Sequence, residues 1–142
     1  MLYTEKTKKA LKLCFEAHKA QKDKSGMPYV FHPFHLAEQM ESEETTVVAL
    51  LHDVVEDSDY TIEDLKAEGF GEEIVEAIAL MTHAKDVDYM DYVALIKKNP
   101  IAKAVKLADL KHNSDLSRLD TIDEKAIKRK EKYQKAIKLL QE

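Results

Sequence analysis

The stretch EETTVVALLHDVVED, residues 43–57, predicts a central helix that is buried on nearly all sides. Ser42 stands before it as a helix cap, and Glu43 and Glu44 lie where the positive end of the helix dipole favours carboxylates. Apolar residues then follow with little interruption, so no face of the helix is left for solvent. A helix of this kind requires other helices packed around it.

The flanking sequence supplies those helices. Upstream, apolar periodicity predicts helices over residues 4–22 and 32–41, separated by the loop KDKSGMPY, in which Gly26 and Pro28 break the helix. Downstream, a polar connection is expected over residues 83–88. Asn99 and Pro100 indicate a cap followed by a first-turn proline. The downstream helices are predicted over residues 61–68, 71–82, 89–98, 100–116 and 123–141, the last packing through Ile127, Ile137 and Leu140.

Composition supports one all-α domain over residues 1–142. The chain is 44% hydrophobic and 35% charged, with only three Gly and three Pro. Its net charge of -5 argues against a general nucleic-acid-binding protein.

No apolar run approaches the roughly 18 residues of a membrane span, and the N-terminus lacks a signal-peptide core, so we expect a cytoplasmic protein with no membrane partner. Cys14, the only cysteine, is expected in the core. The oligomeric state is left open.

His52 and Asp53 lie side by side within the apolar stretch. A buried imidazole beside a buried carboxylate is costly unless both have partners, and a divalent cation satisfies both. A core histidine with a salt-bridged aspartate is the alternative for this pair taken alone. Glu56 and Asp57 follow three and four residues after Asp53, and so many acidic groups within two turns favour a cation. For Asp57, a helix end turning toward solvent remains an alternative.

Two further segments carry candidate ligands. Asp109 lies among apolar residues in VKLADLKHN, which indicates burial or a position facing a cleft, and Asn113 follows one helical turn later. His32 stands before Pro33 at the start of a short helix in PYVFHP. Taken alone, His32 is better explained as a helix-start residue that binds no metal. Nitrogen and oxygen ligands without sulfur suit manganese and do not exclude iron, zinc or cobalt.

The segments KSGMPYVFHP, ALLHDVVEDS and VKLADLKHN, in this order, resemble the HD superfamily of metal-dependent phosphohydrolases. More narrowly, they resemble the hydrolase domain of RelA/SpoT-type alarmone enzymes and the small alarmone hydrolases, over about residues 4–118. The resemblance implies an HD-type helical bundle and hydrolysis of guanosine tetra- or pentaphosphate at the 3′ position, usually with manganese. It implies metal ligation by His32, His52, Asp53 and Asp109, water activation by Glu56 and Asp57, and substrate contacts from Asn113 and the loop containing Lys22 and Lys24.

The loop departs from this family pattern. Asp23 stands where the alarmone hydrolases typically carry an arginine, and Leu110 replaces a basic residue after the distal aspartate. Lys22 and Lys24 flank Asp23 and can attract phosphate, or they belong to a solvated loop. An HD phosphohydrolase acting on another nucleotide and a non-catalytic nucleotide-binding module are therefore alternatives. His112 is a weaker candidate. Residues interpreted as packing or surface residues are Tyr29, Tyr89, Tyr92, Tyr133 and the Lys and Arg residues of the last helix.

Overall fold

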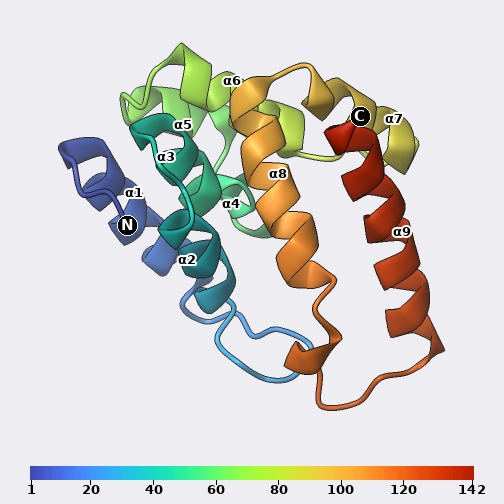
Figure 1. Ribbon diagram of the computed structural model, residues 1–142. Helices are drawn as coiled ribbons and strands as arrows, with labels where there is room; N and C mark the ends of the chain where they lie inside the picture. Colours follow the sequence, from blue (N-terminus) through green and yellow to red (C-terminus); the bar gives the residue numbers. More distant parts are fainter.

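A computed structural model describes all of residues 1–142 and shows helices joined by short loops, with no β-strand (Figure 1). The predicted all-α fold class is confirmed. The helices are α1 (Glu5–His18), α2 (Phe31–Glu38), α3 (Glu43–Leu51), α4 (Val54–Asp57), α5 (Ile62–Ala67), α6 (Glu72–Met81), α7 (Tyr89–Lys97), α8 (Pro100–Asn113) and α9 (Glu124–Gln141), with a 3₁₀ turn over Leu116–Arg118. No helix is long and apolar enough to cross a membrane.

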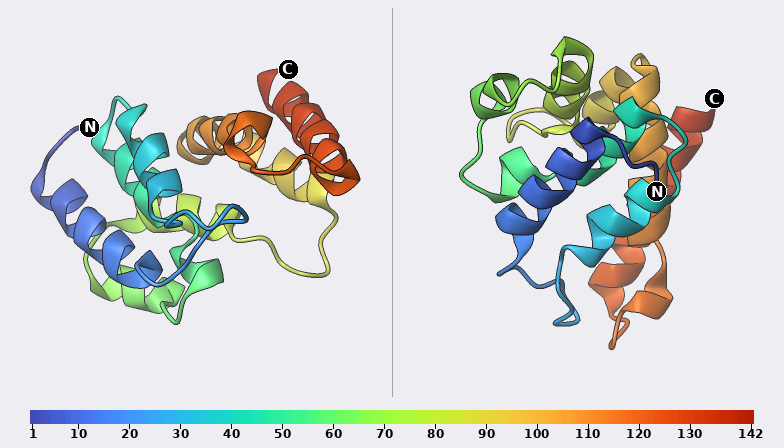
Figure 2. Two further views of the ribbon diagram at one scale, coloured as in Figure 1. Left: turned by 90° about the horizontal axis from the view of Figure 1, so that it is seen from below. Right: turned by 90° about the vertical axis from the view of Figure 1, so that its left-hand side faces the viewer.

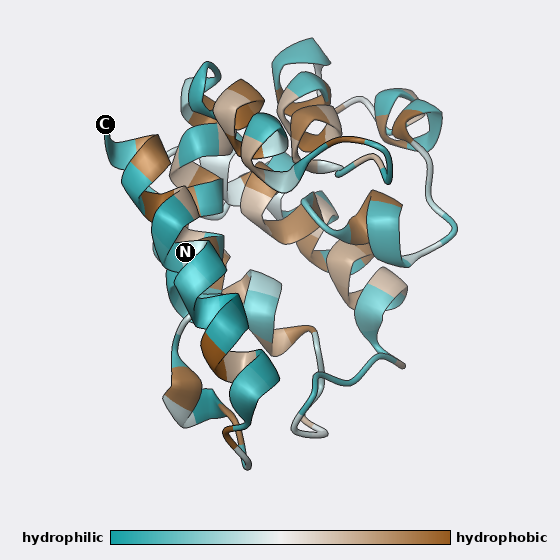
Figure 3. Cartoon of the chain, turned by 90° about the vertical axis from the view of Figure 1, so that its right-hand side faces the viewer, coloured by the Kyte–Doolittle hydropathy of each residue, from teal (hydrophilic) through white to brown (hydrophobic).

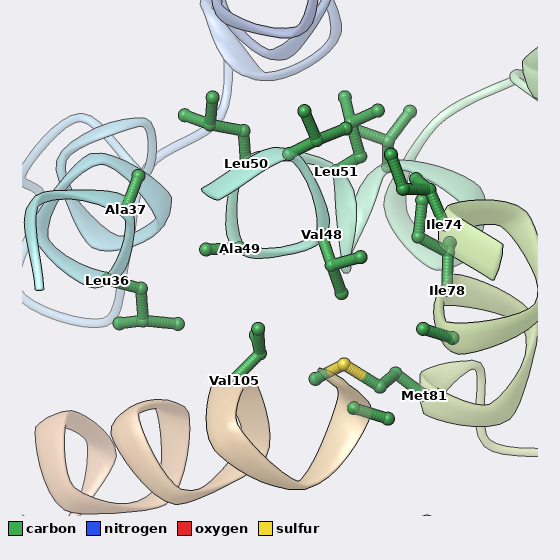
Figure 4. Packing of buried hydrophobic residues seen from close by; sticks show 14 of the residues in the cluster. Leu36, Ala37, Val48, Ala49, Leu50, Leu51, Ile74, Ile78, Met81 and Val105 are labelled. Atoms are coloured by element: carbon green, nitrogen blue, oxygen red, sulfur yellow. The ribbon is translucent and has the colours of Figure 1, made fainter. Parts of the chain in front are cut away.

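Helix α3 is the centre of the core, as the sequence predicts. It packs against α1, α2, α6 and α8, and every residue from Val47 to Leu51 is fully buried. Figure 4 shows Leu36 of α2, Ile78 of α6 and Val105 of α8 surrounding α3. Cys14 of α1 is also fully buried, in agreement with its predicted place in the core. The central helix thereby holds the four neighbouring helices in one continuous core.

Side-chain caps define where most helices begin. A polar side chain before the first turn accepts a backbone N–H bond, which satisfies one of the helix's otherwise unpaired donors. The predicted caps Ser42 and Asn99 are confirmed, Pro100 occupies the first turn of α8, and Thr61 caps α5. Thr4, Asp88 and Asp123 cap α1, α7 and α9 in the same way.

The structure corrects several details of the sequence prediction. The first helix, predicted over residues 4–22, ends at His18. The helix predicted over residues 43–57 is interrupted, because Asp53 has φ −102° and ψ −1° and separates α3 from the short α4. This backbone conformation is sparsely populated and is common among active-site residues. The helix predicted to reach residue 116 ends at Asn113. Ile127, expected to pack, is 47% exposed because Ala126 faces the interior instead.

Two loops meet at one end of the molecule. The loop after α1 and the connection between α8 and α9 lie side by side at the lower end of Figure 1 and in both views of Figure 2. Ser25 Oγ donates to the Arg118 carbonyl at 3.2 Å and accepts from the Asp120 N–H at 3.3 Å. Helix α9 then packs on α7 and α8, with hydrophilic residues predominating on the side seen in Figure 3. This arrangement places residues 19–30 opposite the start of α9.

Truncation of the central helix should destabilise the fold strongly. Leu50 is fully buried in α3, so we expect Leu50→Ala to lower the free energy of unfolding by about 2–5 kcal/mol, because it leaves a cavity. Leu95 is 51% exposed, and the matched Leu95→Ala change should cost no more than about 0.5 kcal/mol. Urea unfolding of both variants measures the difference. Equal losses would contradict the central role of α3.

The buried thiol should be unreactive in the folded protein. Burial, together with the charge of Asp53, raises the pKa of Cys14 to about 12. Because the thiolate is the reactive form, iodoacetamide should not modify native Cys14 at neutral pH but should modify it fully in denaturant. Mass spectrometry of the two samples detects the added group. Rapid modification of the native protein would show that the α1–α3 contact opens readily.

Candidate metal centre

Three of the predicted ligands converge from different parts of the chain. His32 comes from α2, His52 from the break between α3 and α4, and Asp109 from α8, with one ligand atom of each within 4.8 Å of the others. The Nε2 atom of His32 lies 2.8 Å from Asp109 Oδ1, and His52 Nε2 lies 3.5 Å from the same oxygen. The three residues are at most 5% exposed. Two imidazole nitrogens and a carboxylate oxygen thus face one small buried volume.

Asp53 stands at the edge of this cluster. Its Oδ2 atom lies 3.1 Å from His52 Nε2 and accepts a hydrogen bond from the Tyr29 hydroxyl. Burial by itself raises the pKa of Asp53, but the positive charge that His52 carries when it is protonated, with its hydrogen bond, outweighs burial and holds the pKa at about 2. Asp53 is therefore ionised and held in place by Tyr29, a residue that the sequence analysis assigned to packing alone.

His52 shows why the cluster suits a cation. Its Nδ1–H donates to the Ala49 carbonyl at 2.7 Å, and a carbonyl can only accept. In the neutral imidazole, Nε2 then carries a lone pair, and this buried atom has no hydrogen-bond partner. The lone pair faces the carboxylates of Asp53 and Asp109, which is unfavourable unless a cation or proton lies between them. The donor set fits a divalent metal, with Ala49 fixing the tautomer that ligation requires.

The carboxylate of Asp109 is held on both oxygens. Lys106 Nζ donates to Oδ2 at 3.0 Å, and Asn113 Nδ2 donates to Oδ1 at 3.1 Å. Lys106 is itself only 9% exposed and lies 5.2 Å from the centre of the Tyr92 ring. Burial raises the pKa of Asp109, but the ammonium of Lys106 and the hydrogen bonds to His32 and His52 together outweigh burial and keep the pKa well below its ordinary value. Lys106 was missed from the sequence; its spacing of three residues before Asp109 in a helix was the available signal.

His112 contacts His32 at Nδ1, the ring nitrogen that does not face Asp109. Their Nδ1 atoms are 2.7 Å apart, and the two rings stack with centres separated by 5.0 Å. Burial and the charge of Arg118 lower the pKa of His112 to about 4, so its ring is neutral near pH 7 and its Nδ1 can accept a hydrogen bond from the His32 Nδ1–H. That hydrogen bond leaves the Nε2 lone pair of His32 directed at the cluster.

The two acidic residues of α4 point in different directions. Asp57 lines the cavity beside the cluster, whereas Glu56 accepts a hydrogen bond from the His83 backbone N–H. Burial and the charge of Asp53 raise the pKa of Asp57, and burial is also the main cause that raises the pKa of Glu56. Both residues are near the centre, but only Asp57 faces the cavity.

The cavity has a volume of about 620 Å³ and begins at the metal cluster. His32, Asp57 and Asn113 line it near the cluster, and the predicted Lys22 and Lys24 line it from the loop after α1. Arg118, Arg129 and Tyr133 also line it. The assignment of every basic residue of the last helix to solvent was therefore wrong for Arg129, because α9 folds back beside the loop. A basic cavity next to an acidic, metal-binding cluster suits a phosphorylated small molecule.

Comparison with known proteins agrees with this arrangement. A sequence model described as "HD domain" matches residues 10–137. The chain is 33% identical over 148 residues to the guanosine-3′,5′-bis(diphosphate) 3′-pyrophosphohydrolase of Aquifex aeolicus, covering 96% of this chain and 20% of that protein. It is 35% identical over 109 residues to the GTP pyrophosphokinase of Streptomyces coelicolor, covering 68% of this chain and 13% of that protein. The chain thus spans about a fifth or less of these curated relatives.

A solved structure has the same overall fold. It is described as "A metazoan ortholog of SpoT hydrolyzes ppGpp and plays a role in starvation responses", and it aligns with a TM-score of 0.77 and 25% sequence identity. The alignment covers 99% of this chain and 88% of that one. Together with the sequence match over residues 10–137, it shows that the chain belongs to the HD-domain family.

Proposed function

We propose that the chain is a metal-dependent hydrolase that converts guanosine-3′,5′-bis(diphosphate) to GDP and pyrophosphate, with manganese as its cofactor. The observation that carries the proposal is the unpartnered Nε2 atom of His52, which faces the carboxylates of Asp53 and Asp109. His32 of the same cluster lines the adjacent cavity, which also presents Lys and Arg side chains. The names of the Aquifex relative and the metazoan structure support the same substrate. The sequence match over residues 10–137 supports one HD hydrolase domain over residues 1–142.

In this proposal, His32, His52, Asp53 and Asp109 hold the metal. A bound divalent ion acidifies water and offsets negative charge on phosphoryl oxygens. Tyr29, Lys106 and His112 fix the ligands in place through their bonds to Asp53, Asp109 and His32 respectively. The ligands therefore need little rearrangement to bind the ion, which favours affinity and precise placement.

Glu56 and Asp57 act on the attacking water. Asp57 faces the cavity and can accept the water proton, and burial together with the charge of Asp53 raises its pKa and so increases its basicity. Glu56, anchored on the His83 N–H, contributes negative charge near Asp57. A new bond forms between the water oxygen and the phosphorus attached to the ribose 3′ oxygen. The bond from that phosphorus to the 3′ oxygen breaks, and the 3′ oxygen leaves with a proton.

Lys22, Lys24 and Asn113 are the proposed substrate contacts. The two lysines line the cavity from the loop, where their ammonium groups can attract phosphates. Asn113 lines the same cavity while its amide donates to Asp109, so it links the substrate region with the metal cluster. Asp23 also lines the cavity, and a carboxylate there is the observation that favours a second candidate function, hydrolysis of another nucleotide.

The decisive experiment follows both products from one substrate. Metal-stripped protein is incubated with guanosine-3′,5′-bis(diphosphate), with and without manganese, and GDP and pyrophosphate are measured. We expect manganese-dependent release of both in equal amounts. Release from a different nucleotide alone would favour the second candidate. Nucleotide binding without hydrolysis under any metal would identify a non-catalytic module.

Substitutions should separate metal binding from water activation. We expect Asp53→Ala to lose bound metal and turnover together, because it removes a ligand. Glu56→Gln and Asp57→Asn should keep metal binding but lower kcat by about 10²–10⁴-fold, since a proton acceptor or its charged neighbour is lost. Glu131→Gln removes an exposed carboxylate of α9 and serves as the matched control. Full activity of the metal-depleted Asp53→Ala protein would contradict the assigned centre.

A further inference from the structure

Arg118 lies in the wall of the cavity although it belongs to neither the metal cluster nor the basic loop. It ends the 3₁₀ turn Leu116–Arg118, between α8 and α9, and its side chain is 27% exposed. Ser25 joins this turn to the loop after α1 through hydrogen bonds to the backbones of Arg118 and Asp120. The guanidinium is therefore placed where the two loops at the lower end of Figure 1 meet.

Three acceptors hold this guanidinium. Its Nη1 atom donates to the His112 carbonyl at 2.9 Å and to Asn113 Oδ1 at 3.4 Å, and its Nη2 atom lies 3.9 Å from Asp23 Oδ2. Asp23 is itself fixed, because its Oδ1 accepts from the backbone N–H groups of Ser25 and Met27. Since Asn113 also donates to Asp109, a continuous set of contacts runs from Asp23 to the metal cluster. Arg118 is thereby held at a set position relative to that cluster.

The charge of Arg118 is balanced, unlike the charges of the other cations in the cavity. Asp23 offsets its positive charge, whereas neither Lys24 nor Arg129 forms an ion pair. Burial and the nearby Arg129 lower the pKa of Lys24, and the charge of Asp123 opposes this shift only in part, which indicates that Lys24 and Arg129 lie near each other. Two neighbouring cations that form no ion pair suit phosphate groups. A charge-balanced, planar guanidinium suits an uncharged aromatic ring better, because it can stack without drawing a phosphate.

Apolar residues flank Arg118 in the cavity wall. Leu116 and Leu119 stand on either side of it in the sequence, and both line the cavity together with Tyr133. Apolar side chains beside a guanidinium form a surface that a flat heterocycle can cover, whereas they add nothing to phosphate binding.

We propose that Arg118, held by Asp23 and flanked by Leu116 and Leu119, contacts the nucleobase of the substrate and determines specificity for it. The proposal rests on the proposed nucleotide hydrolase function. It assigns the basic groups of the cavity to two tasks: Lys22, Lys24 and Arg129 bind phosphate, and Arg118 binds the base. It also gives Asp23 a positioning role, because its carboxylate offsets and orients the guanidinium.

Two ligands that differ only in the base test this assignment. GMP and ribose 5-phosphate are titrated into the manganese-loaded full chain by calorimetry, and the ratio of their dissociation constants reports the contribution of the base. We expect the wild type to favour GMP, and Arg118→Lys to reduce that preference by about tenfold, the magnitude of a lost stacking contact. Asp23→Asn keeps the guanidinium but removes its counter-charge, so it should strengthen ribose 5-phosphate binding. Lys128→Met, on the exposed side of α9, is the control.

Three outcomes would overturn the proposal. In the first, the wild type binds GMP no better than ribose 5-phosphate. In the second, the Arg118→Lys protein keeps the full preference for GMP. In the third, Arg118→Lys weakens binding of both ligands equally, which would mean that Arg118 only joins the loops. Thermal unfolding of each variant shows that the fold is retained, and Asp23→Asn provides an independent readout if Arg118→Lys does not fold. Neither ligand has a 3′-diphosphate. Failure of the alarmone hydrolysis assay therefore leaves this measurement interpretable.

Discussion

The arrangement of the site depends on the hydrogen bond between His52 Nδ1 and the Ala49 carbonyl. This bond assigns the proton to Nδ1 and turns the Nε2 lone pair toward the carboxylates of Asp53 and Asp109. It forms because the chain leaves the α3 helix after Leu51, within the fully buried part of the core. A rigid core thus holds an electrostatically unfavourable group in place, and a cation relieves the cost.

Asp109 connects this centre with the rest of the molecule. Its two oxygens take bonds from Lys106 and Asn113, and Oδ1 also lies 2.8 Å from His32. Lys106 offsets part of the negative charge that two aspartates bring to a buried site, which reduces the desolvation cost of the cluster before any ion binds. Asn113 extends the network to Arg118. A change in the loop region can therefore reach the metal cluster through two side chains.

The cavity gathers basic side chains that are distant in the sequence. Lys22, Lys24, Arg118 and Arg129 come from two loops and from α9, while Asp57 lies near the metal cluster and Asp23 and Asp115 lie in the loops. This convergence explains how a chain of net charge -5 can offer a local site for an anionic ligand. It also explains the acidic residue at position 23. In the folded chain the Asp23 carboxylate faces Arg118, so it does not stand alone as a repulsive group for phosphate.

The sequence by itself determined the helices, their caps and the buried centre, because these depend on residues within about one turn of each other. It also singled out His52, Asp53 and Asp109, since polar groups inside apolar helical segments need partners. Tertiary structure alone decided the break at Asp53, the separation of Glu56 from Asp57, and the participation of Tyr29. It also decided which basic residues line the cavity. In the sequence, Arg129 looks like the other basic residues of α9. It lines the cavity because α9 packs against α7 and α8 and so lies beside the loop after α1.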